Sequence, residues 1–377
     1  MDVTQIVLLA AGGTGGHLFP AEALAASLGR RGFDVDLATD ARAARYAGHF
    51  PARELHVLPA DTVRGRSPVA LARTGFALAS GLVSSLALLR RVKPVAVVGF
   101  GGYPTVPPLL AAALLGVPTL IHEANGVMGR ANRMLARRVS AIATGFPGIV
   151  AADPALAPKA VWTGNPLRPS AIAAAATPYD PPLAGGELRL LVFGGSQGAR
   201  VMSDVVPEAI ERLDGDLRSR LVLTQQAREE DLERVKATYA RLGVRAQVAP
   251  FFDDLPARMA QAHLVVSRSG AGTVAELAAI GRPSILVPLP HALDQDQAAN
   301  ARSLADVGAA LVLRQVEFDP DRVALELHSF ASEPRSLTQM ADKARSQGVL
   351  DAAERLGDLV RHLAAKGAVA TFQGKLA

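Results

Sequence analysis

The chain has 377 residues, a formal net charge of +5, and 20% charged residues, which is the composition of a globular protein and not of a disordered one. The length predicts two to three domains, each able to bury its own core. Because the chain contains no cysteine, disulfides, thiolate zinc sites and cysteine nucleophiles are excluded. No secretory signal is expected at the start, since no basic segment precedes an apolar run with a cleavage site.

The first half alternates short apolar runs with segments of helical spacing. Strands are expected at residues 6–11, 33–38, 54–58, 95–99, 119–122, 141–144 and 160–163. Helices are expected at residues 19–31, 67–92, 105–115 and 127–139. This alternation predicts a parallel sheet with right-handed crossovers.

The second half begins after residues 164–186, whose density of proline and glycine predicts a linker. Strands are then expected at residues 188–193, 221–224, 245–249, 264–267, 284–288 and 310–313. Helices are expected at residues 199–213, 228–242, 272–280 and 295–306, and three more helices close the chain, the last at about 351–366. The predicted fold class is therefore α/β, with two parallel-sheet domains and a helical tail.

Three glycine clusters follow apolar runs: GGTGG at 12–16, GFGGY at 99–103 and GGSQG at 194–198. Each is typical of a strand, a tight turn and a helix start, where free backbone N–H groups suit a phosphate. The first and third lie about half a chain apart, which suggests two nucleotide-fold domains facing each other. None completes the G-x-G-x-x-G pattern, so a nicotinamide enzyme is disfavoured, although Asp36 lies at the spacing of a ribose-binding acid.

Positive charge is concentrated in the first half. No Asp or Glu occurs from Thr62 to His122, and the stretch from Thr62 to Ala152 holds ten bases and one acid. The bases flank an apolar helix, which fits either an interfacial helix on anionic lipid or an amphipathic helix packed on its own sheet. A spanning helix and a nucleic-acid site are both disfavoured, since the uncharged run is short and lacks interleaved aromatics. The candidate membrane residues are Arg64, Arg66, Arg73, Phe76, Arg90, Arg91 and Lys93.

Polar residues gather after two strands of the second half. Ser269 and Thr273 suit a helix N-terminus that holds phosphate, and Glu276, one turn later, is either a ribose ligand or a solvated helix residue. Asp294 and Asp296 have a spacing that could hold a divalent cation. Direct hydrogen bonding of Asp296 and its neighbour Gln297 to sugar hydroxyls is preferred, because the glycine loops and helix dipoles already offset diphosphate charge.

Eight motifs together resemble one family. They are GGTGGH, GFGGY, HEAN (His122–Asn125), GNPLR (Gly164–Arg168), GGSQGA, FFDDL (Phe251–Leu255), SRSGAGTVAEL and PHALDQDQAANA. In this order, over about 300 residues, they resemble the undecaprenyl-diphospho-muramoylpentapeptide β-N-acetylglucosaminyltransferases, of glycosyltransferase family 28.

The resemblance implies a GT-B fold, in which two Rossmann-like domains flank a deep cleft. An acceptor and membrane domain is expected at 1–165, with helix 351–367 packing back on it, and a UDP-N-acetylglucosamine domain at 166–350. The acceptor would be lipid I at the cytoplasmic membrane face, and the product lipid II for peptidoglycan synthesis. Anionic phospholipid and other cell-wall or division proteins are the further partners expected, and nucleic acid is not.

The resemblance also implies residue roles: Phe252 by the uracil, Glu276 on the ribose, and Ser196 along the diphosphate. The donor-binding set is Thr14, Gly15, Gly16, Asn125, Arg168, Gly195, Ser196, Gln197, Gly198, Phe252, Ser269, Gly270, Ala271, Gly272, Thr273, Glu276, Asp296 and Gln297. The acceptor-binding set is Gly12, Gly13, Thr14, Gly101, Gly102, Tyr103, His122 and Asn125. Two positions depart from the family pattern, since Ala124 and Asp296 stand where glutamine occurs in other members.

The implied reaction is a single inverting displacement at C1 of the sugar, which needs a base for the acceptor C4 hydroxyl and dipoles for the leaving diphosphate. His17 is the first candidate base, because histidine titrates near neutrality. Glu123 is the second candidate and His291 the third. A histidine after glycines is also a common capping or packing residue. No cofactor is expected to be required, and a divalent cation is not expected to be essential.

Two rival functions remain from the sequence. A UDP-N-acetylglucosamine 2-epimerase would share the donor site but need no basic apolar face. A non-catalytic membrane or nucleotide-binding protein would need neither His17 nor Glu123.

Overall fold

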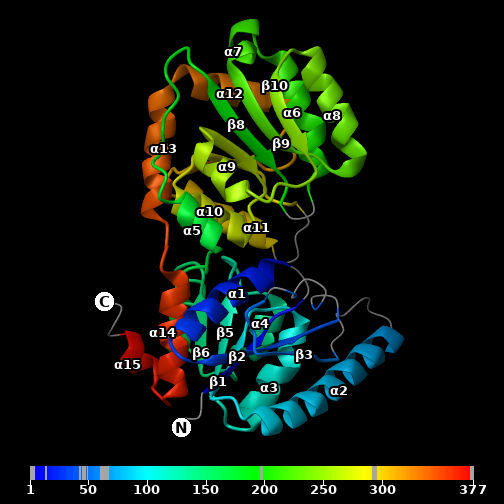
Figure 1. Ribbon diagram of the computed structural model, residues 1–377, viewed down its shortest axis with the longest axis vertical. Helices are drawn as coiled ribbons and strands as arrows, with labels where there is room; N and C mark the ends of the chain where they lie inside the picture. Colours follow the sequence, from blue (N-terminus) through cyan, green and yellow to red (C-terminus); the bar gives the residue numbers. More distant parts are fainter. Residues whose placement is uncertain are drawn as a thin grey trace. The chain divides into compact units, whose positions relative to one another are not determined.

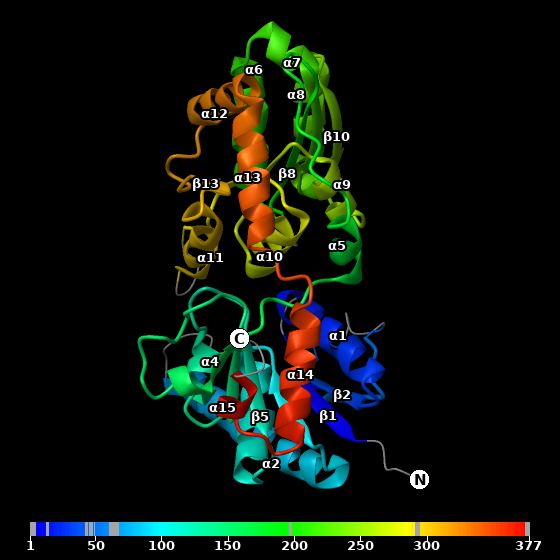
Figure 2. The same cartoon turned by 90° about the vertical axis from the view of Figure 1, so that its left-hand side faces the viewer.

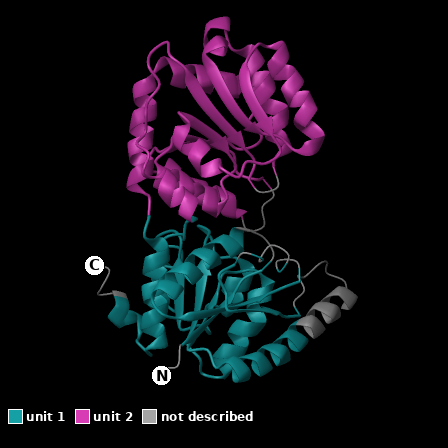
Figure 3. Ribbon diagram, in the orientation of Figure 1, with its two compact units in different colours: residues 1–168, 350–377 teal, residues 169–349 magenta. Residues whose placement is uncertain are grey.

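The computed structural model divides the chain into two compact units (Figure 3). Unit 1 comprises Met1–Arg168 and Leu350–Ala377, and unit 2 comprises Pro169–Val349. The division falls after Arg168, where the sequence predicted it after residue 165. The structure describes all residues except 1–4, 13–14, 42–43, 45–47, 49, 60–67, 196–197, 291–294 and 374–377, and leaves out the side chains of 15, 68–77 and 373.

Unit 1 is built on a parallel sheet of seven strands in the order β3-β2-β1-β4-β5-β6-β7. Its strands are β1 (Ile6–Ala10), β2 (Asp34–Thr39), β3 (Glu54–Val57), β4 (Ala96–Gly99), β5 (Thr119–Glu123), β6 (Ala141–Thr144) and β7 (Ala160–Trp162). The strand order reverses between β1 and β4, and ligands of such sheets bind beyond the carboxyl ends of the strands at this point.

Helices cover both faces of this sheet (Figure 1). They are α1 (Gly15–Arg30), α2 (Pro68–Val92), η2 (Tyr103–Thr105), α3 (Val106–Leu114), α4 (Arg130–Leu135) and η3 (Ala157–Lys159). Alternate residues of β1 enter different cores: Val7 and Leu9 pack in the cluster that includes α1, while Leu8 and Ala10 pack with α3 and α4. Burial on both faces explains why the strand is a continuous apolar run.

The C-terminal helices α14 (Ala352–Ala364) and α15 (Val369–Gln373) belong to unit 1. Leu356 and Val360 of α14 complete the apolar cluster beneath α1, and the two helices lie side by side in Figure 2. Polar contacts reinforce the packing, since Arg31 pairs with Glu354 and, at 3.2 Å, with Asp358.

Unit 2 carries a second parallel sheet, in the order β10-β9-β8-β11-β12-β13. Its strands are β8 (Leu188–Phe193), β9 (Leu221–Gln226), β10 (Arg245–Ala249), β11 (Leu264–Ser267), β12 (Ser284–Leu286) and β13 (Ala310–Val312). Its helices are α5 (Pro169–Ala174), α6 (Arg200–Arg212), α7 (Gly215–Arg220), α8 (Glu229–Arg241), α9 (Leu255–Gln261), α10 (Ala271–Ile280), α11 (Asp296–Ala305), α12 (Pro320–Ser332) and α13 (Pro334–Ser346). The predicted α/β class with two parallel-sheet domains is confirmed.

The segment predicted to be a linker is instead folded onto unit 2. It contains α5, and the buried guanidinium of Arg282 donates to the carbonyl oxygens of Thr177 and Pro178, both at 3.2 Å. The same guanidinium lies 5.4 Å from the ring centre of Tyr179. Burial lowers the pKa of Arg282 to about 10, so the side chain stays charged at neutral pH.

The short helices are where the sequence prediction was wrong. It missed α5, α7 and α9, and it expected three helices after β13 where the described residues form four, α12 to α15. The helix predicted at 127–139 is only α4, Arg130–Leu135. Among the described residues no helix is long and apolar enough to cross a membrane.

Candidate active site

The first glycine loop and His17 lie at the carboxyl end of β1 in unit 1. His17 is in the first turn of α1, and its Nδ1 donates to the carbonyl oxygen of Gly12 at 3.0 Å. In the neutral imidazole this bond places the proton on Nδ1 and leaves Nε2 as a lone-pair acceptor. The residue is half-buried, so part of the imidazole is open to solvent.

The GFGGY loop after β4 packs against this ring. A Cβ atom on Gly101 would lie 3.4 Å from Nε2 of His17, and one on Gly102 would lie 3.5 Å from its Cε1. Both glycines have positive φ, +90° and +78°, which other residues rarely adopt. The glycines therefore let the loop approach the histidine closely.

Glu123, at the end of β5, holds the next loop. Its side chain is 2% exposed. One carboxylate oxygen accepts from the backbone N–H of Asn125 at 3.0 Å and the other from that of Gly129 at 2.9 Å. Nδ2 of Asn132 adds a bond of 2.8 Å. These bonds keep residues 124–129 in a loop and explain why α4 begins only at Arg130.

This geometry assigns Glu123 a supporting position beneath the loop. Its carboxylate oxygens are already engaged by these N–H groups, and the residue is buried. His17 is the more accessible of the two candidate bases in unit 1.

His122 is fully buried beneath the same loops. Its Nε2 donates to the carbonyl oxygen of Gly164 at 3.2 Å, and its ring lies 5.6 Å from that of Phe100. Burial lowers the pKa of His122 to about 4, so the ring is neutral at physiological pH. Its side chain supports the loops from below, whereas Tyr103 and Asn125 are half-buried and closer to solvent.

Arg168 lies at the end of the GNPLR motif and packs on α1. Its guanidinium is 5.4 Å from the ring centre of Phe19, which is exposed. Another residue of this motif, Asn165, donates through Nδ2 to the carbonyl oxygen of Ala124 at 2.9 Å. The motif after β7 thus holds the HEAN loop after β5.

In unit 2, the GGSQG cluster at 194–198 follows β8. The N–H of Gly194 donates to Oε1 of Gln226 at 3.0 Å. Gly195 and Gly198 have φ values of +90° and +67°, and a Cβ on Gly194 would overlap Ala199. The loop's conformation therefore requires glycine.

Helix α10 presents its N-terminus at the carboxyl end of β11. Its N-cap is Gly270 and no side chain caps the helix, so the first N–H groups, from Ala271 to Thr273, suit an anion. Glu276 follows one turn later and is buried. The predicted phosphate site at this helix start is thus lined by backbone N–H groups, and a buried acid follows one turn later.

Hydrogen bonds of Ser269 and Gln297 join the segment after β11, the start of α11 and the segment after β12. Oγ of Ser269 donates to the carbonyl oxygen of Gln297 at 2.8 Å, and Oε1 of Gln297 accepts from the N–H of Leu289 at 3.1 Å. Oδ1 of Asp296 accepts from the N–H of Gln297 at 2.8 Å. These side chains position the polypeptide around the predicted sugar site.

Of the two aromatic residues after β10, Phe252 is buried and Phe251 is 61% exposed. The guanidinium of Arg258 covers the Phe252 ring at 4.4 Å. One face of Phe252 is therefore occupied, and Phe251 offers the accessible aromatic surface.

Sequence reasoning missed several side chains that position these loops. Arg268 is buried and donates to the carbonyl oxygens of Val287 and Pro288, at 3.0 and 3.1 Å. Asn132, Asn165 and Gln226 likewise hold loops by bonds to distant parts of their unit. Arg268 and Asn165 lie within the family motifs, but the spacing of the motifs does not predict which backbone groups these side chains contact.

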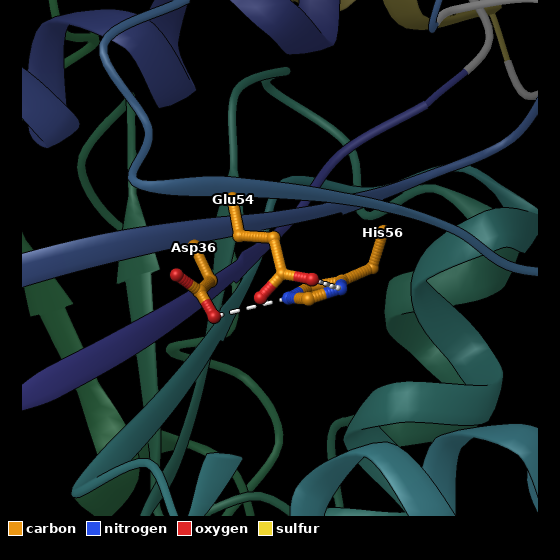
Figure 4. A group of neighbouring side chains, drawn as sticks. All are labelled: Asp36, Glu54 and His56. Carbon is orange, nitrogen blue, oxygen red and sulfur yellow. Dashed lines mark hydrogen bonds and ion pairs between the residues drawn. The ribbon is translucent and has the colours of Figure 1, made fainter. Parts of the chain in front are cut away.

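An acid–imidazole cluster lies elsewhere in unit 1, on β2 and β3 (Figure 4). His56 stands between two carboxylates, with Nε2 3.0 Å from Asp36 and Nδ1 3.5 Å from Glu54. The ligand atoms are close enough for a metal ion, yet both oxygens of Asp36 already accept from Arg53, at 2.8 and 2.7 Å. These bonds outweigh burial and lower the pKa of Asp36. The cluster is thus an ion-paired network, and Asp36, the acid at ribose-binding spacing in the sequence, is fully buried and engaged by Arg53 and His56.

Some predicted site residues lie outside the described residues. They are Gly13, Thr14, Arg64, Arg66, Ser196, Gln197 and His291. Gly15, Arg73 and Phe76 lie in described helices, α1 and α2, but their side chains are not described.

Comparison with known proteins gives the family. Residues 7–144 match the glycosyltransferase family 28 N-terminal domain, and residues 189–356 match the glycosyltransferase family 28 C-terminal domain. The chain belongs to glycosyltransferase family 28. It is therefore a glycosyltransferase.

Individual relatives agree with this assignment. A Nitrobacter hamburgensis protein named UDP-N-acetylglucosamine–N-acetylmuramyl-(pentapeptide) pyrophosphoryl-undecaprenol N-acetylglucosamine transferase is 61% identical over 97% of this chain and 98% of its own length. The crystal structure of Acinetobacter baumannii MurG is 32% identical and superposes with a TM-score of 0.78, covering 95% of this chain and 99% of that one. The family resemblance drawn from the motifs is confirmed.

The fold is shared more widely than the family. The structure of a putative UDP-N-acetylglucosamine 2-epimerase from Listeria monocytogenes superposes with a TM-score of 0.68 over 98% of this chain and 99% of that one, at 14% identity. This likeness concerns the fold alone.

Glu123 gives a first prediction. Replacing it with glutamine removes the negative charge and leaves one N–H donor facing another, so Glu123→Gln should lower the free energy of unfolding by roughly 1–3 kcal/mol and reduce glycosyl transfer. Denaturant unfolding and initial rates measure the two effects. Glu233→Gln, on an exposed side chain of α8, is the control. A Glu123→Gln protein as stable as wild type would contradict the anchoring role.

Proposed function

We propose that this chain transfers N-acetylglucosamine from UDP-N-acetylglucosamine to the C4 hydroxyl of the muramoyl-pentapeptide of lipid I, giving lipid II. The observation that carries the proposal is the 61% sequence identity, over 97% of this chain, with a relative named for this transfer. The glycine loops and helix termini at the carboxyl ends of both sheets are suited to bind diphosphate groups, which both substrates contain.

His17 is the proposed base. Its Nδ1 proton is held by Gly12, so Nε2 is the atom that would take the proton from the acceptor hydroxyl as the new bond forms. Proximity of the GFGGY loop to Nε2 supports an acceptor site formed by the first glycine loop and Gly101–Gly102. Glu123 would act through the loop that it holds and not by proton transfer.

Unit 2 would bind the donor. The uncapped N-terminus of α10 and the loop at 194–198 would stabilise the charge that develops on the departing UDP. Glu276 is placed to accept from ribose hydroxyls, and Asp296 and Gln297 would lie by the sugar. Because these N–H dipoles would offset the negative charge on the departing UDP, no divalent cation is needed in the proposed reaction.

The 2-epimerase is the alternative on the same fold. The 2-epimerase structure shares the fold at only 14% sequence identity. The relatives named as transferases are 61% and 63% identical in sequence over nearly the whole chain. A mixed basic and apolar surface also favours a lipid-linked acceptor over a soluble substrate alone.

The proposed location is the cytoplasmic face of the cell membrane, where the chain would be peripheral. Large apolar side chains are exposed on the helices that cover one face of the unit 1 sheet: Val83, Leu114, Leu115 and Met134. Exposed bases lie on or next to the same helices: Arg90, Arg91, Lys93, Arg130, Arg133, Arg137 and Arg138. Apolar groups with flanking bases suit an anionic lipid surface.

The transfer itself is tested with labelled UDP-N-acetylglucosamine. Label should pass to a short-chain lipid I analogue, equally with and without EDTA, and UDP should be released in equal amount. Conversion of the nucleotide sugar without any lipid acceptor would identify an epimerase. Loss of transfer in EDTA, restored by magnesium, would contradict the metal-free reaction.

His17 gives a test of the base. Removing the imidazole in His17→Ala should lower kcat by about 10²–10⁴-fold, with the KM for the donor nearly unchanged, because the donor is proposed to bind unit 2. Steady-state kinetics separate the two constants. His328→Ala, on the exposed surface of α12, should behave as wild type. An unchanged kcat in His17→Ala would remove His17 from this role.

Membrane binding is tested with a matched pair of variants. Leu114 is 70% exposed on α3 and Leu325 is 63% exposed on α12. Leu114→Asp should weaken binding to anionic vesicles, because a charge enters the proposed apolar contact, whereas Leu325→Asp should not. Wild-type binding in a sedimentation assay should rise with the anionic lipid fraction and fall with salt. Indifference to both would defeat the proposed surface.

A further inference from the structure

An arginine that no family motif contains lies against the glycine loop of unit 2. Arg228 follows β9 and is the N-cap of α8, beside the carboxyl end of β8. Its side chain crosses Gly198, where an added Cβ would lie 3.0 Å from Cγ of Arg228. Its Nη2 donates to the carbonyl oxygen of Gly198 at 3.3 Å.

Together with Gln226, Arg228 holds both ends of the loop. Gln226 accepts from the N–H of Gly194, and Arg228 donates to the carbonyl oxygen of Gly198. The two side chains come from one strand end, two residues apart. Gly194 and Gly198 are thus both tied to side chains that follow β9.

The guanidinium of Arg228 retains unused hydrogen-bonding capacity. Among the residues that the structure describes, its buried Nε has no acceptor, and Nη1 is 3.7 Å from Glu230, beyond hydrogen-bond distance. The side chain as a whole is 39% exposed. Arginine carries five N–H donors, so the partly exposed guanidinium can still donate to a ligand oxygen.

Two other arginines after the strands of this unit are already engaged. Arg268 donates to two backbone carbonyls and to Gln315, and Arg258 is bonded to Asp254 and stacked on Phe252. Within the described part of the chain, Arg228 has a 3.3 Å bond to the carbonyl oxygen of Gly198 and lies 3.7 Å from Glu230. It is therefore the better placed of the three to compensate the charge of a phosphate group.

We propose that Arg228 binds the diphosphate of the nucleotide donor beside Gly198, and stabilises the negative charge that the UDP leaving group gains. The proposal rests on the donor site assigned to unit 2 under the proposed function. Arginine suits this task because it remains charged and presents several donors to phosphate oxygens.

The test is equilibrium binding of UDP and of uridine to purified full-length variants. In Arg228→Gln the Kd for UDP should rise about 10- to 100-fold, the range expected for one charged hydrogen-bonding group, while the Kd for uridine stays unchanged. Arg228→Lys should recover part of the UDP affinity, because the charge is restored. Arg241→Gln, at the opposite end of α8 and paired with Glu211, is the matched control and should bind UDP as wild type.

Two results would overturn the proposal. Unchanged UDP affinity in Arg228→Gln would remove the contact. Equal weakening for UDP and uridine would reduce Arg228 to a support of the loop. The binding assay is separate from transfer, so a wild-type protein that binds UDP but transfers no sugar to lipid I would refute the proposed function and leave Arg228 in place.

Discussion

Burial of both sheet faces confines ligand binding in each unit to the loops beyond the strand ends. β11 is buried along its whole length and β1 from Val7 to Ala10. Helices cover the two sides, so backbone hydrogen-bonding groups become available only where strands stop. The glycine loops, His17, Glu123 and the α10 N-terminus all lie at carboxyl ends. Each unit therefore has one edge on which polar chemistry can be assembled.

At these edges, most of the polar side chains described above form hydrogen bonds that position the loops. Glu123 bonds to the backbone of its own loop, Ser269 to Gln297, and Gln226 to Gly194. What they position is largely backbone: N–H groups at a helix start and carbonyls beside an imidazole. Such an arrangement favours anionic ligands, because the dipoles are already oriented before a ligand arrives.

The strands were predictable because a buried parallel strand is a short apolar run that ends in glycine or a polar residue. Four strands, β6, β8, β10 and β11, have the predicted bounds. The prediction was wrong where tertiary bonds override local preference: Glu123 prevents a helix from starting before Arg130, and Arg282 converts a proline-rich segment into packed structure. The family motifs identified His17 and the glycine loops, but Arg228 and Gln226 were missed, because their partners, Gly198 and Gly194, follow the neighbouring strand β8 and are distant in sequence.

The packing of α14 has a consequence for how the chain is made. Unit 1 is discontinuous, since its core includes Leu356, Leu359 and Val360, which follow all of unit 2 in the sequence. On the ribosome, where folding generally proceeds from the N-terminus, the face of the first sheet beneath α1 therefore stays open until the last part of the chain emerges. Unit 2 is contiguous and can close first, so the domain encoded earlier is the one completed later.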